Sequence, residues 1–463
     1  MHQDIRGLDV TTTSPKAVEH LDRAVADYLN YGTNASTEVK AALAEDPACV
    51  LAQCYRGYLL MMLENPAVFP KLRQTLAELE KAGGEVTERE RGHLAALKAW
   101  VKGDLMNACL AWEQVLNQWP QDLMALKLHH TMAFYTGRSN VLRSVVSGAL
   151  GAWDEATPGY SHVQGMYAYA LEECGAYADA ERWGRAAVEA NRDDLWAIHS
   201  VAHVMEMQGR FDEGADWLDY SKDDWASKNF FKAHVWWHRG LFHIVAENYD
   251  RALGVFDEEL SSLNSETYVD VSNQAAFLKR LQIAGVDVGN RWDLLAEHSA
   301  TRIHDHVLPF RDAHFCLALA AKGRFDTARE QIRSMAVFAN EGEGWNARTT
   351  QATLIPLCEA MIAYESGEYA KACGILWPMR NELAPIGGSL AQRDLFAQIL
   401  IDAAVRAGRL PMARSLLSER VAQFPRGRRG WREYGKVLAD LGELDLAAKA
   451  HRSAEALSAP AAA

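Results

Sequence analysis

The sequence predicts an all-α protein, an α-solenoid of helix-turn-helix repeats that curls around a concave inner cavity. Two observations carry this prediction. A short turn phrase built on glycine recurs along the chain, and its copies at 103 and 137, at 175 and 209, and at 408 and 442 are each 34 residues apart. In addition, 49% of the residues are hydrophobic, which is enough for a large core and argues against disorder.

The turn phrase consists of a glycine, one further residue, and an aromatic residue or leucine that opens the next helix. Glycine adopts left-handed backbone freely and therefore ends the first helix of a pair. The aromatic residue is expected to pack in the angle between the two helices. The 34-residue period is that of tetratricopeptide repeats. The copies are Gly103-Asp104-Leu105, Gly175-Ala176-Tyr177, Gly209-Arg210-Phe211, Gly323-Arg324-Phe325, Gly367-Glu368-Tyr369, Gly408-Arg409-Leu410 and Gly442-Glu443-Leu444, with Gly137-Arg138 as a weaker copy and Asn248-Tyr249 in the same slot.

One helical hairpin cannot bury its apolar face alone, and its stacked neighbours supply the missing contacts. We therefore expect residues 1–463 to form a single helical-repeat domain of about eight to ten hairpins. The pattern lapses between about 261 and 310, where we expect helices of irregular length and a loop near Gly285–Asn290. Residues 338–350 are polar and glycine-rich and are expected to form another loop. The tail 458–463 is expected to be frayed.

The composition limits the cellular compartment and the classes of binding partner that we expect. The formal net charge of −13 argues against non-specific binding to nucleic acid or to an anionic membrane. The sequence has no apolar signal region at its start and no apolar run of about 18 residues, so no membrane span is expected. The seven cysteines are scattered and form no Cys-x-x-Cys pair, which fits buried free thiols in a reducing compartment. We expect a cytoplasmic protein without nucleic-acid or membrane partners.

Titratable and aromatic residues gather on the helices expected to line the concave face, which are the first helices of successive pairs. Counted back from Gly209, one helix carries four of them on one face: Trp196, His199, His203 and Glu206. The preceding repeat has His162, Tyr169 and Glu172 at the same frame positions. The following repeat, counted from Asn248, brings His234, Trp237 and His238. Three adjacent helices are thus predicted to face one space.

Two further segments supply candidates for the same cavity if the superhelix curls far enough. Asp312 and His314 lie at the start of a later first helix, in Arg311–Phe315. Arg393 follows Gly387-Gly388-Ser389 at the start of another helix, where it either binds an anionic group or braces the protein internally. The segment lacks the lysine and the preceding strand of a phosphate-binding loop, so it does not predict nucleotide binding.

Three interpretations of the histidines remain open. In the first, His199, His203 and His238 ligate zinc, iron or manganese, because His-x-x-x-His places two imidazoles on one helical face. In the second, His203 or His238 acts as a general base without a metal, oriented by Glu206 or Glu172, and the aromatic residues hold a ligand. In the third, the histidines are hydrogen-bonded core groups and the concave groove binds a peptide.

Several segments together resemble the tetratricopeptide repeat protein 38 family. They are Trp196–Met207, His234–His238 with Tyr249–Leu253, Val286–Trp292, Arg311–Phe315, and Gly387–Ser389 with Gln392–Asp394, in this order between about 160 and 400. Arg192 departs from the proline that the family tends to have where the repeat closes. The resemblance implies a helical-repeat fold and a cytoplasmic protein, and it implies no activity.

The favoured function is therefore a pocket lined by His, Glu and Trp that binds a small molecule. Histidine base catalysis or metal-assisted hydrolysis would fit these groups, although the sequence leaves open whether the protein is an enzyme. In this interpretation the polar lining is formed by His199, His203, Glu206, His234, His238 and His314. The alternative is a non-catalytic scaffold that binds a peptide or protein partner in its groove.

Overall fold

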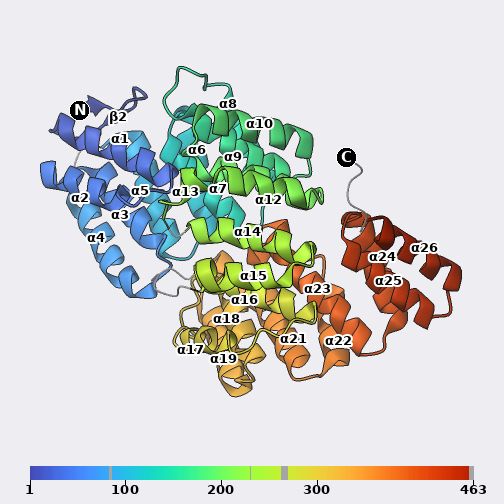
Figure 1. Ribbon diagram of the computed structural model, residues 1–463. Coiled ribbons are helices and arrows are strands. Elements are labelled where there is room, and N and C mark those ends of the chain that lie inside the picture. The colour runs from blue at the N-terminus through green and yellow to red at the C-terminus, as the bar shows by residue number, and fades with distance from the viewer. Residues whose placement is uncertain (83–85, 230, 262–268, 458–463) are drawn as a thin grey trace.

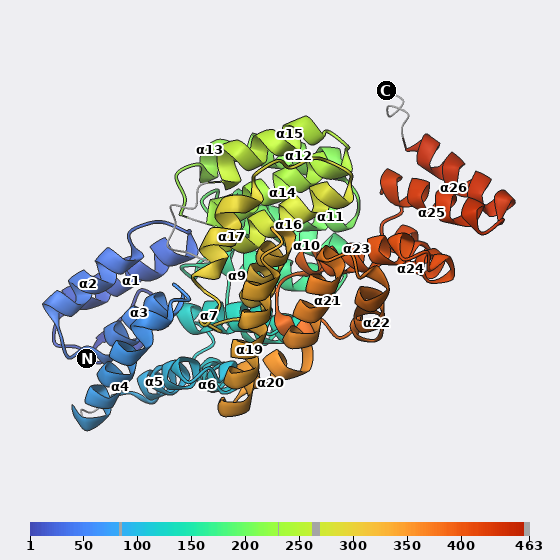
Figure 2. The ribbon, with the colours of Figure 1, turned by 90° about the horizontal axis from the view of Figure 1, so that it is seen from below.

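The fold is an all-α solenoid, as the turn phrase predicts. The computed structural model describes residues 1–82, 86–229, 231–261 and 269–457. The only strands in these ranges are β1 (His2–Gln3) and β2 (Asp9–Val10), which pair antiparallel with His2 opposite Val10. All other regular elements in these ranges are helices, which stack in pairs and curl around (Figures 1 and 2).

The first part of the stack runs from the N-terminus to the helix that carries His199 and the short helices after it. Its elements are α1 (Pro15–Leu29), α2 (Ala35–Glu45), α3 (Val50–Met61), the 3-10 helix η1 (Pro66–Val68), α4 (Phe69–Ala82), α5 (Glu88–Val101), α6 (Leu105–Gln118), α7 (Leu123–Tyr135), α8 (Ser139–Leu150), α9 (Tyr160–Glu172), α10 (Tyr177–Ala190), α11 (Leu195–Met207), α12 (Phe211–Tyr220) and α13 (Lys222–Trp225).

The second part continues the array to the C-terminal pair, which lies at the far right of Figure 1. Its elements are α14 (Phe231–Val245), α15 (Tyr249–Val255), the π-helix η2 (Phe256–Leu260), α16 (Val269–Ile283), α17 (Trp292–Ala300), α18 (Pro309–Ala321), α19 (Phe325–Glu341), α20 (Trp345–Thr349), the π-helix η3 (Thr350–Leu354), α21 (Ile355–Glu365), α22 (Tyr369–Met379), the 3-10 helix η4 (Ala384–Ile386), α23 (Leu390–Arg406), α24 (Leu410–Gln423), α25 (Arg428–Asp440) and α26 (Leu444–Ala456).

The turn glycines adopt the left-handed backbone that the sequence predicts, with φ between 64° and 81° at every glycine of the phrase. The turn before α15 corrects the sequence analysis, because Glu247 and not Asn248 is the left-handed residue there, with φ of 61°. Asn248 caps α15, as Arg210 caps α12. The repeat frame of α14 is therefore shifted by one residue from a count that starts at Asn248. Trp237, and not His238, lies at the position equivalent to His199, and His234 lies at the position equivalent to Trp196.

The sequence predictions for the two irregular stretches have different outcomes. Between about 261 and 310 the described residues form helices at 269–283 and 292–300, with a non-helical segment around Gly285–Asn290 between them, and residues 262–268 lie outside the described residues. The loop predicted at 338–350 is wrong in extent, because α19 continues to Glu341 and α20 begins at Trp345. Only residues 342–344 separate these two helices, where Gly344 has a φ of 90°. The tail 458–463 also lies outside the described residues.

The superhelix curls back on itself around the inner face of α11. The helices α9, α11, α14, α16, α18 and α21 pack one against the next, and α23 then packs against both α16 and α11. Among the described residues, the core comprises two large clusters, which meet at α14, and two small ones. Phe231, Val235 and Phe242 belong to the N-terminal core, whereas Trp237 and Leu241 belong to the C-terminal one.

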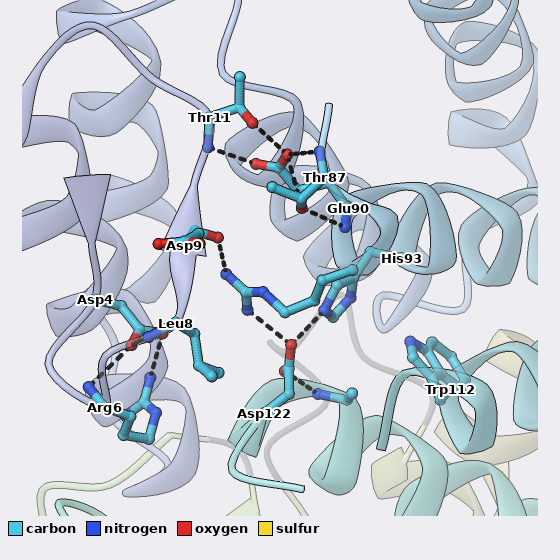
Figure 3. Close-up of polar contacts among 12 residues, drawn as sticks. Asp4, Arg6, Leu8, Asp9, Thr11, Thr87, Glu90, His93, Trp112 and Asp122 are labelled. Atoms are coloured by element: carbon cyan, nitrogen blue, oxygen red, sulfur yellow. Dashed lines mark hydrogen bonds and ion pairs between the residues drawn. The ribbon is translucent and has the colours of Figure 1, made fainter. Parts of the chain in front are cut away.

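The N-terminal hairpin is tied to the stack by a buried polar network (Figure 3). Arg89 donates from Nη1 to Asp122 at 2.8 Å and from Nη2 to the carbonyl oxygen of Asp9 at 2.8 Å. His93 places Nε2 at 2.9 Å from Asp122, and its Nδ1 lies 3.0 Å from the hydroxyl of Tyr58. Both nitrogens of this buried histidine are therefore satisfied, so His93 is a structural core residue.

The remaining features of the fold concern the cysteines and the apolar length of the helices. All seven cysteines are free, and Cys174 alone among them is half-buried rather than buried. Among the described residues, no helix is both long enough and apolar enough to cross a membrane.

Candidate metal centre and adjoining cavity

Four buried histidines from two neighbouring helices come together at one point. α11 supplies His199 and His203, and α14 supplies His234 and His238, so that each pair lies on one face of its helix. One ring nitrogen from each histidine lies within 4.8 Å of the others. The ring centroids of His199 and His203 and those of His203 and His238 are 4.4 Å apart. Such spacing allows all four imidazoles to reach one ion.

The rings of His234 and His238 are held by acceptors on the side away from the cluster. Nδ1 of His234 lies 3.0 Å from Oδ1 of Asn273 on α16, and Nδ1 of His238 lies 2.6 Å from Oε2 of Glu206. The tautomers and the amide orientation follow from this network. With Glu206 ionised, both Nδ1 atoms carry a hydrogen, and both Nε2 atoms present lone pairs to the cluster. Metal-ligating histidines are oriented in this way.

The two Nε2 atoms of His234 and His238 face each other at 3.2 Å. Two lone pairs at this distance repel each other unless a cation lies beside them both. Ligand nitrogens at 2.0–2.1 Å from a tetrahedral zinc ion are separated by roughly 3.3 Å. The observed separation is therefore close to the edge of such a coordination tetrahedron.

The other two histidines have ring nitrogens without partners. Neither nitrogen of His199 or His203 has a hydrogen-bond partner among the described residues, although both side chains are buried. A buried polar atom without a partner costs about 1–3 kcal/mol. Burial lowers the pKa of all four cluster histidines, which keeps them neutral, and neutral imidazole is the form that binds a metal.

Two buried carboxyl groups, Glu172 and Glu173, and the half-buried Glu206 lie beside the cluster. Oε2 of Glu172 is 3.5 Å from Nδ1 of His203, and Glu172, Glu173 and His203 form a second group of atoms within 4.8 Å of one another. Burial raises the pKa of Glu172 to about 8 and that of Glu173 and of Glu206 to about 7. These groups therefore exchange protons near neutral pH, as general acids or bases must. Glu206 also lines a second cavity of about 290 Å³.

A cavity of about 390 Å³ adjoins the cluster. His199 and His234 form part of its wall, together with the aromatic rings of Tyr169, Trp196 and Phe231. The ring of Trp196 is 5.1 Å from that of His199, and the ring of Tyr169 is 5.8 Å from it. A volume of this size takes a small organic molecule. A ligand in the cavity would contact two of the four histidines.

Most of the residues predicted for the site thus lie at the cluster or in the cavity wall. Trp237 stacks behind His234 with ring centroids 5.2 Å apart and forms no part of the cavity wall. Arg393 donates to the carbonyl oxygens of Gly387 and Gly388, so it braces the segment that reaches the cavity through Gly388. Internal bracing, one of the two roles considered for Arg393, accounts for these contacts.

The structure does not bring three of the predicted residues to the cluster. His162 pairs with Asp194 at 3.1 Å at the opposite end of α9 from Glu172. The carboxylate of Asp312 lies 3.0 Å from Nδ1 of His306. His314 places Nδ1 at 2.7 Å from the carbonyl oxygen of Phe310, and its ring packs 4.4 Å from that of Phe310, which itself faces the cavity. The helical period fixes the face of a residue, but not which neighbour meets its side chain.

Other residues of the site were missed by the sequence analysis. Asn273 lies within the stretch where the repeat pattern lapses, and nothing in the sequence distinguishes it. Glu173 is adjacent to the predicted Glu172, but the helical frame assigns it to another face. Lys127 and Tyr31 line the cavity from α7 and from the turn after α1, which lie far from the recognised motifs. Arg311 lies in one of the segments that resemble the family, and the sequence assigns it no role.

No family model matches the chain. Among solved structures, human IFIT1 as a dimer with PPP-AAAA is similar over 85% of this chain and 95% of that chain, at 12% identity and a TM-score of 0.35. Yeast Tom70 is similar over 96% of this chain and 90% of that chain, at 14% identity and a TM-score of 0.33. The tetratricopeptide domain of P58(IPK) is similar over 80% and 93%, at 11% identity and a TM-score of 0.23.

The chain has a tetratricopeptide-like helical-repeat fold. Turns 34 residues apart, their left-handed glycines and the stacked helix pairs all have this character. With TM-scores of 0.35 and below, the whole arrays do not superpose, and these neighbours carry no information on what this helical-repeat protein binds.

Proposed function

We propose that this helical-repeat protein binds one transition-metal ion through His199, His203, His234 and His238, beside a cavity that takes a small molecule. One observation carries the proposal. The Nε2 atoms of His234 and His238 face each other at 3.2 Å while acceptors hold their Nδ1 atoms. A cation removes the repulsion and also satisfies the unpartnered nitrogens of the other two histidines. Four imidazole ligands favour zinc or iron over manganese.

The position of the proposed metal at the cavity wall supports a chemical role. His199 and His234 line the cavity, so a bound molecule or a water would reach the ion from that side. Four imidazoles fill a tetrahedral zinc ion, so the ion would activate water or polarise a carbonyl group only by taking a further ligand from the cavity, as five-coordinate zinc or as six-coordinate iron. Glu172 and Glu206 lie outside the cavity wall, against His203 and His238, so they would exchange protons near neutral pH through these two rings, and Glu206 would also hold His238 in position. Metal-assisted hydrolysis is the reaction class that these groups fit.

The second candidate is a scaffold without catalytic function. The helical-repeat fold supports it, because such arrays present extended concave surfaces to partner chains. In this case the histidines are structural, and the proton shared by Nε2 of His234 and His238 comes from a protonated Glu206. This candidate predicts that the purified protein contains no metal and that it retains a peptide or protein partner.

The proposal also covers the family, the domain organisation and the cellular location of the protein. We infer membership of the tetratricopeptide repeat protein 38 family, because the segments Trp196–Met207 and His234–His238 that carry the resemblance also form the cluster. A single domain over residues 1–463 is supported by the buried ion pair between Glu64 and Arg311, which are 247 residues apart. A cytoplasmic location is supported by the seven free cysteines.

Elemental analysis of tag-free protein by mass spectrometry tests the metal. The wild type should contain close to one zinc or iron per chain, and His203→Ala should lose it. His130→Ala is the matched control, because His130 is also buried with both nitrogens unpartnered among the described residues but lies outside the cluster. Absence of metal from the wild type, or retention by His203→Ala, would remove the proposal and leave the scaffold function.

A further inference from the structure

The wall of the 390 Å³ cavity carries positive charge and no negative charge. Its residues include Lys127 from α7 and Arg311 from α18, and no aspartate or glutamate is among those that the structure describes. The remaining wall is mostly aromatic or aliphatic, and includes Phe134, Trp196 and Phe231. A cavity with this lining is complementary to a molecule that combines an apolar body with a negative group.

Only one of the two cations is already neutralised by the protein. Arg311 places Nε at 2.8 Å from Oε2 of Glu64, and both side chains are buried. Lys127 forms no ion pair with a carboxylate among the described residues. Its Nζ donates to the hydroxyl of Tyr31 at 3.0 Å and lies 4.2 Å from the ring centroid of Trp196.

The environment of Lys127 makes an unneutralised charge costly. Its side chain is only 3% exposed, and burial lowers the pKa of its amine to about 7 although the charge of Asp194 acts to raise it. A buried lysine without a counter-ion is expected to exchange its proton or to receive an anion from outside. The amine lies at the wall of a cavity large enough to bring that anion, so the second possibility is open to it.

We propose that the cavity binds a small organic carboxylate with an aromatic or apolar body, and that Lys127 receives the carboxylate. The body would lie against Trp196 and Phe231, whose rings are 5.5 Å apart. The cavity offers one cation that the protein does not neutralise, so a single negative charge is balanced there, whereas the second charge of a phosphate monoester would be buried without a partner. Trp196 contacts both Lys127 and His199, so the bound acid would lie next to the histidine cluster.

This inference rests on the proposed function only in taking the cavity as the ligand site, and it does not require the metal. The test uses isothermal titration calorimetry of full-length protein with naphthalene-2-carboxylate and with the neutral naphthalene-2-carboxamide. Lys127→Met removes the charge at similar length, and Lys127→Arg retains it. Lys222→Met is the matched control, because Lys222 lies 5.3 Å over the ring of Trp236 outside the cavity.

The carboxylate should bind the wild type and Lys222→Met equally and bind Lys127→Met at least about tenfold more weakly. Lys127→Arg should retain most of the affinity, so a loss confined to Lys127→Met follows the charge and not the replacement of residue 127 as such. The amide should bind the wild type as weakly as the acid binds Lys127→Met. Equal affinity for acid and amide, undiminished binding by Lys127→Met, or no binding of the acid to folded wild type would overturn the inference.

His203→Ala separates this inference from the metal proposal, because His203 is a cluster residue that does not line the cavity. If His203→Ala and the wild type bind the carboxylate alike and neither contains metal, the anion site stands and the metal proposal fails. If the wild type contains metal but binds acid and amide alike, the metal proposal stands and the anion site fails.

Discussion

At the scale of single residues, hydrogen-bond acceptors behind the rings decide which nitrogens of His234 and His238 face the cluster. Asn273 lies on α16, outside the two helices that carry the histidines, yet its amide oxygen holds the ring of His234 with Nε2 toward His238. His93 shows the opposite arrangement, since both of its nitrogens are used within the core. Burial alone therefore does not distinguish a ligand from a structural histidine.

Replacement of Asn273 by leucine should weaken metal binding tenfold to about a hundredfold, because the ring of His234 loses the acceptor that orients it. Competition with a chromophoric chelator measures the affinity. Gln331→Leu is the control, because Gln331 is also a buried amide and bonds instead to the carbonyl oxygen of Asp312. Equal metal affinity in the two variants would contradict the role of Asn273.

The buried amine of Lys127 makes stability depend on pH. Burial lowers its pKa in the folded protein to about 7, below the ordinary value of 10.5, so between these values the unfolded chain binds more protons. The contribution of this group to stability therefore rises with pH over that window. Asp194, Tyr31, His130 and His199 are the titratable groups around it.

Lys127→Met should therefore be more stable than the wild type at pH 7, by on the order of 4 kcal/mol, and the difference should shrink toward pH 10. Urea unfolding at a series of pH values measures it. Substitution of the exposed Lys222 by methionine should change stability by less than about 0.5 kcal/mol. A difference between Lys127→Met and wild type that does not vary with pH would show that the amine is not desolvated.

At the scale of helices, the close approach of α14 and α16 places Asn273 beside His234. Gly240 permits this approach, because a Cβ atom there would lie 2.4 Å from the ring of Phe277 on α16. Gly254 on α15 has no atom within 4 Å of the corresponding position. Only Gly240 is therefore required for close packing of two helices, whereas Gly254 has room for a side chain.

Gly240→Ala should destabilise the protein by about 1–3 kcal/mol and weaken metal binding, because α16 must move away from α14. Gly254→Ala should instead stabilise it by about 0.5–1 kcal/mol through helix propensity. Denaturant unfolding measures both, with metal affinity as the second readout. The account of the helix approach would be wrong if the two substitutions had the same sign.

The sequence predicts the elements of this fold better than their mutual contacts. The turn phrase locates the hairpins, since glycine is required where the backbone is left-handed, and the helical period places His199 with His203 and His234 with His238. It misses the shift of one residue at Glu247, because a non-glycine residue takes the left-handed position there. It also misses Asn273, since a residue that only hydrogen-bonds to a histidine of the cluster leaves no periodic signal in the sequence.

At the scale of the whole molecule, residues far apart in sequence close the cavity. Glu64 accepts from Arg311 and from the hydroxyl of Tyr135, and Asn229 donates from its backbone to the carbonyl oxygen of Tyr31. The repeat pattern describes only neighbouring hairpins, so contacts across 247 residues cannot be deduced from it. The sequence therefore predicts an inner cavity without predicting the charges that line it.

Glu64→Gln should destabilise the protein by roughly 3–5 kcal/mol, because it leaves the buried guanidinium of Arg311 without its counter-ion. Thermal unfolding measures the loss. Glu368→Gln breaks the exposed pair with Lys371 and should cost less than about 1 kcal/mol. Similar costs for the two variants would mean that the buried pair does not hold the first repeats against α18.

The central claim is that four histidines hold one metal ion, and an anomalous difference map tests it most directly. Crystals grown with zinc would be measured on both sides of the zinc absorption edge. The account predicts one peak per chain at about 2.0–2.1 Å from a ring nitrogen of each of His199, His203, His234 and His238. A peak held instead by Glu172, Glu173 and His203, or no peak at either group, would contradict it.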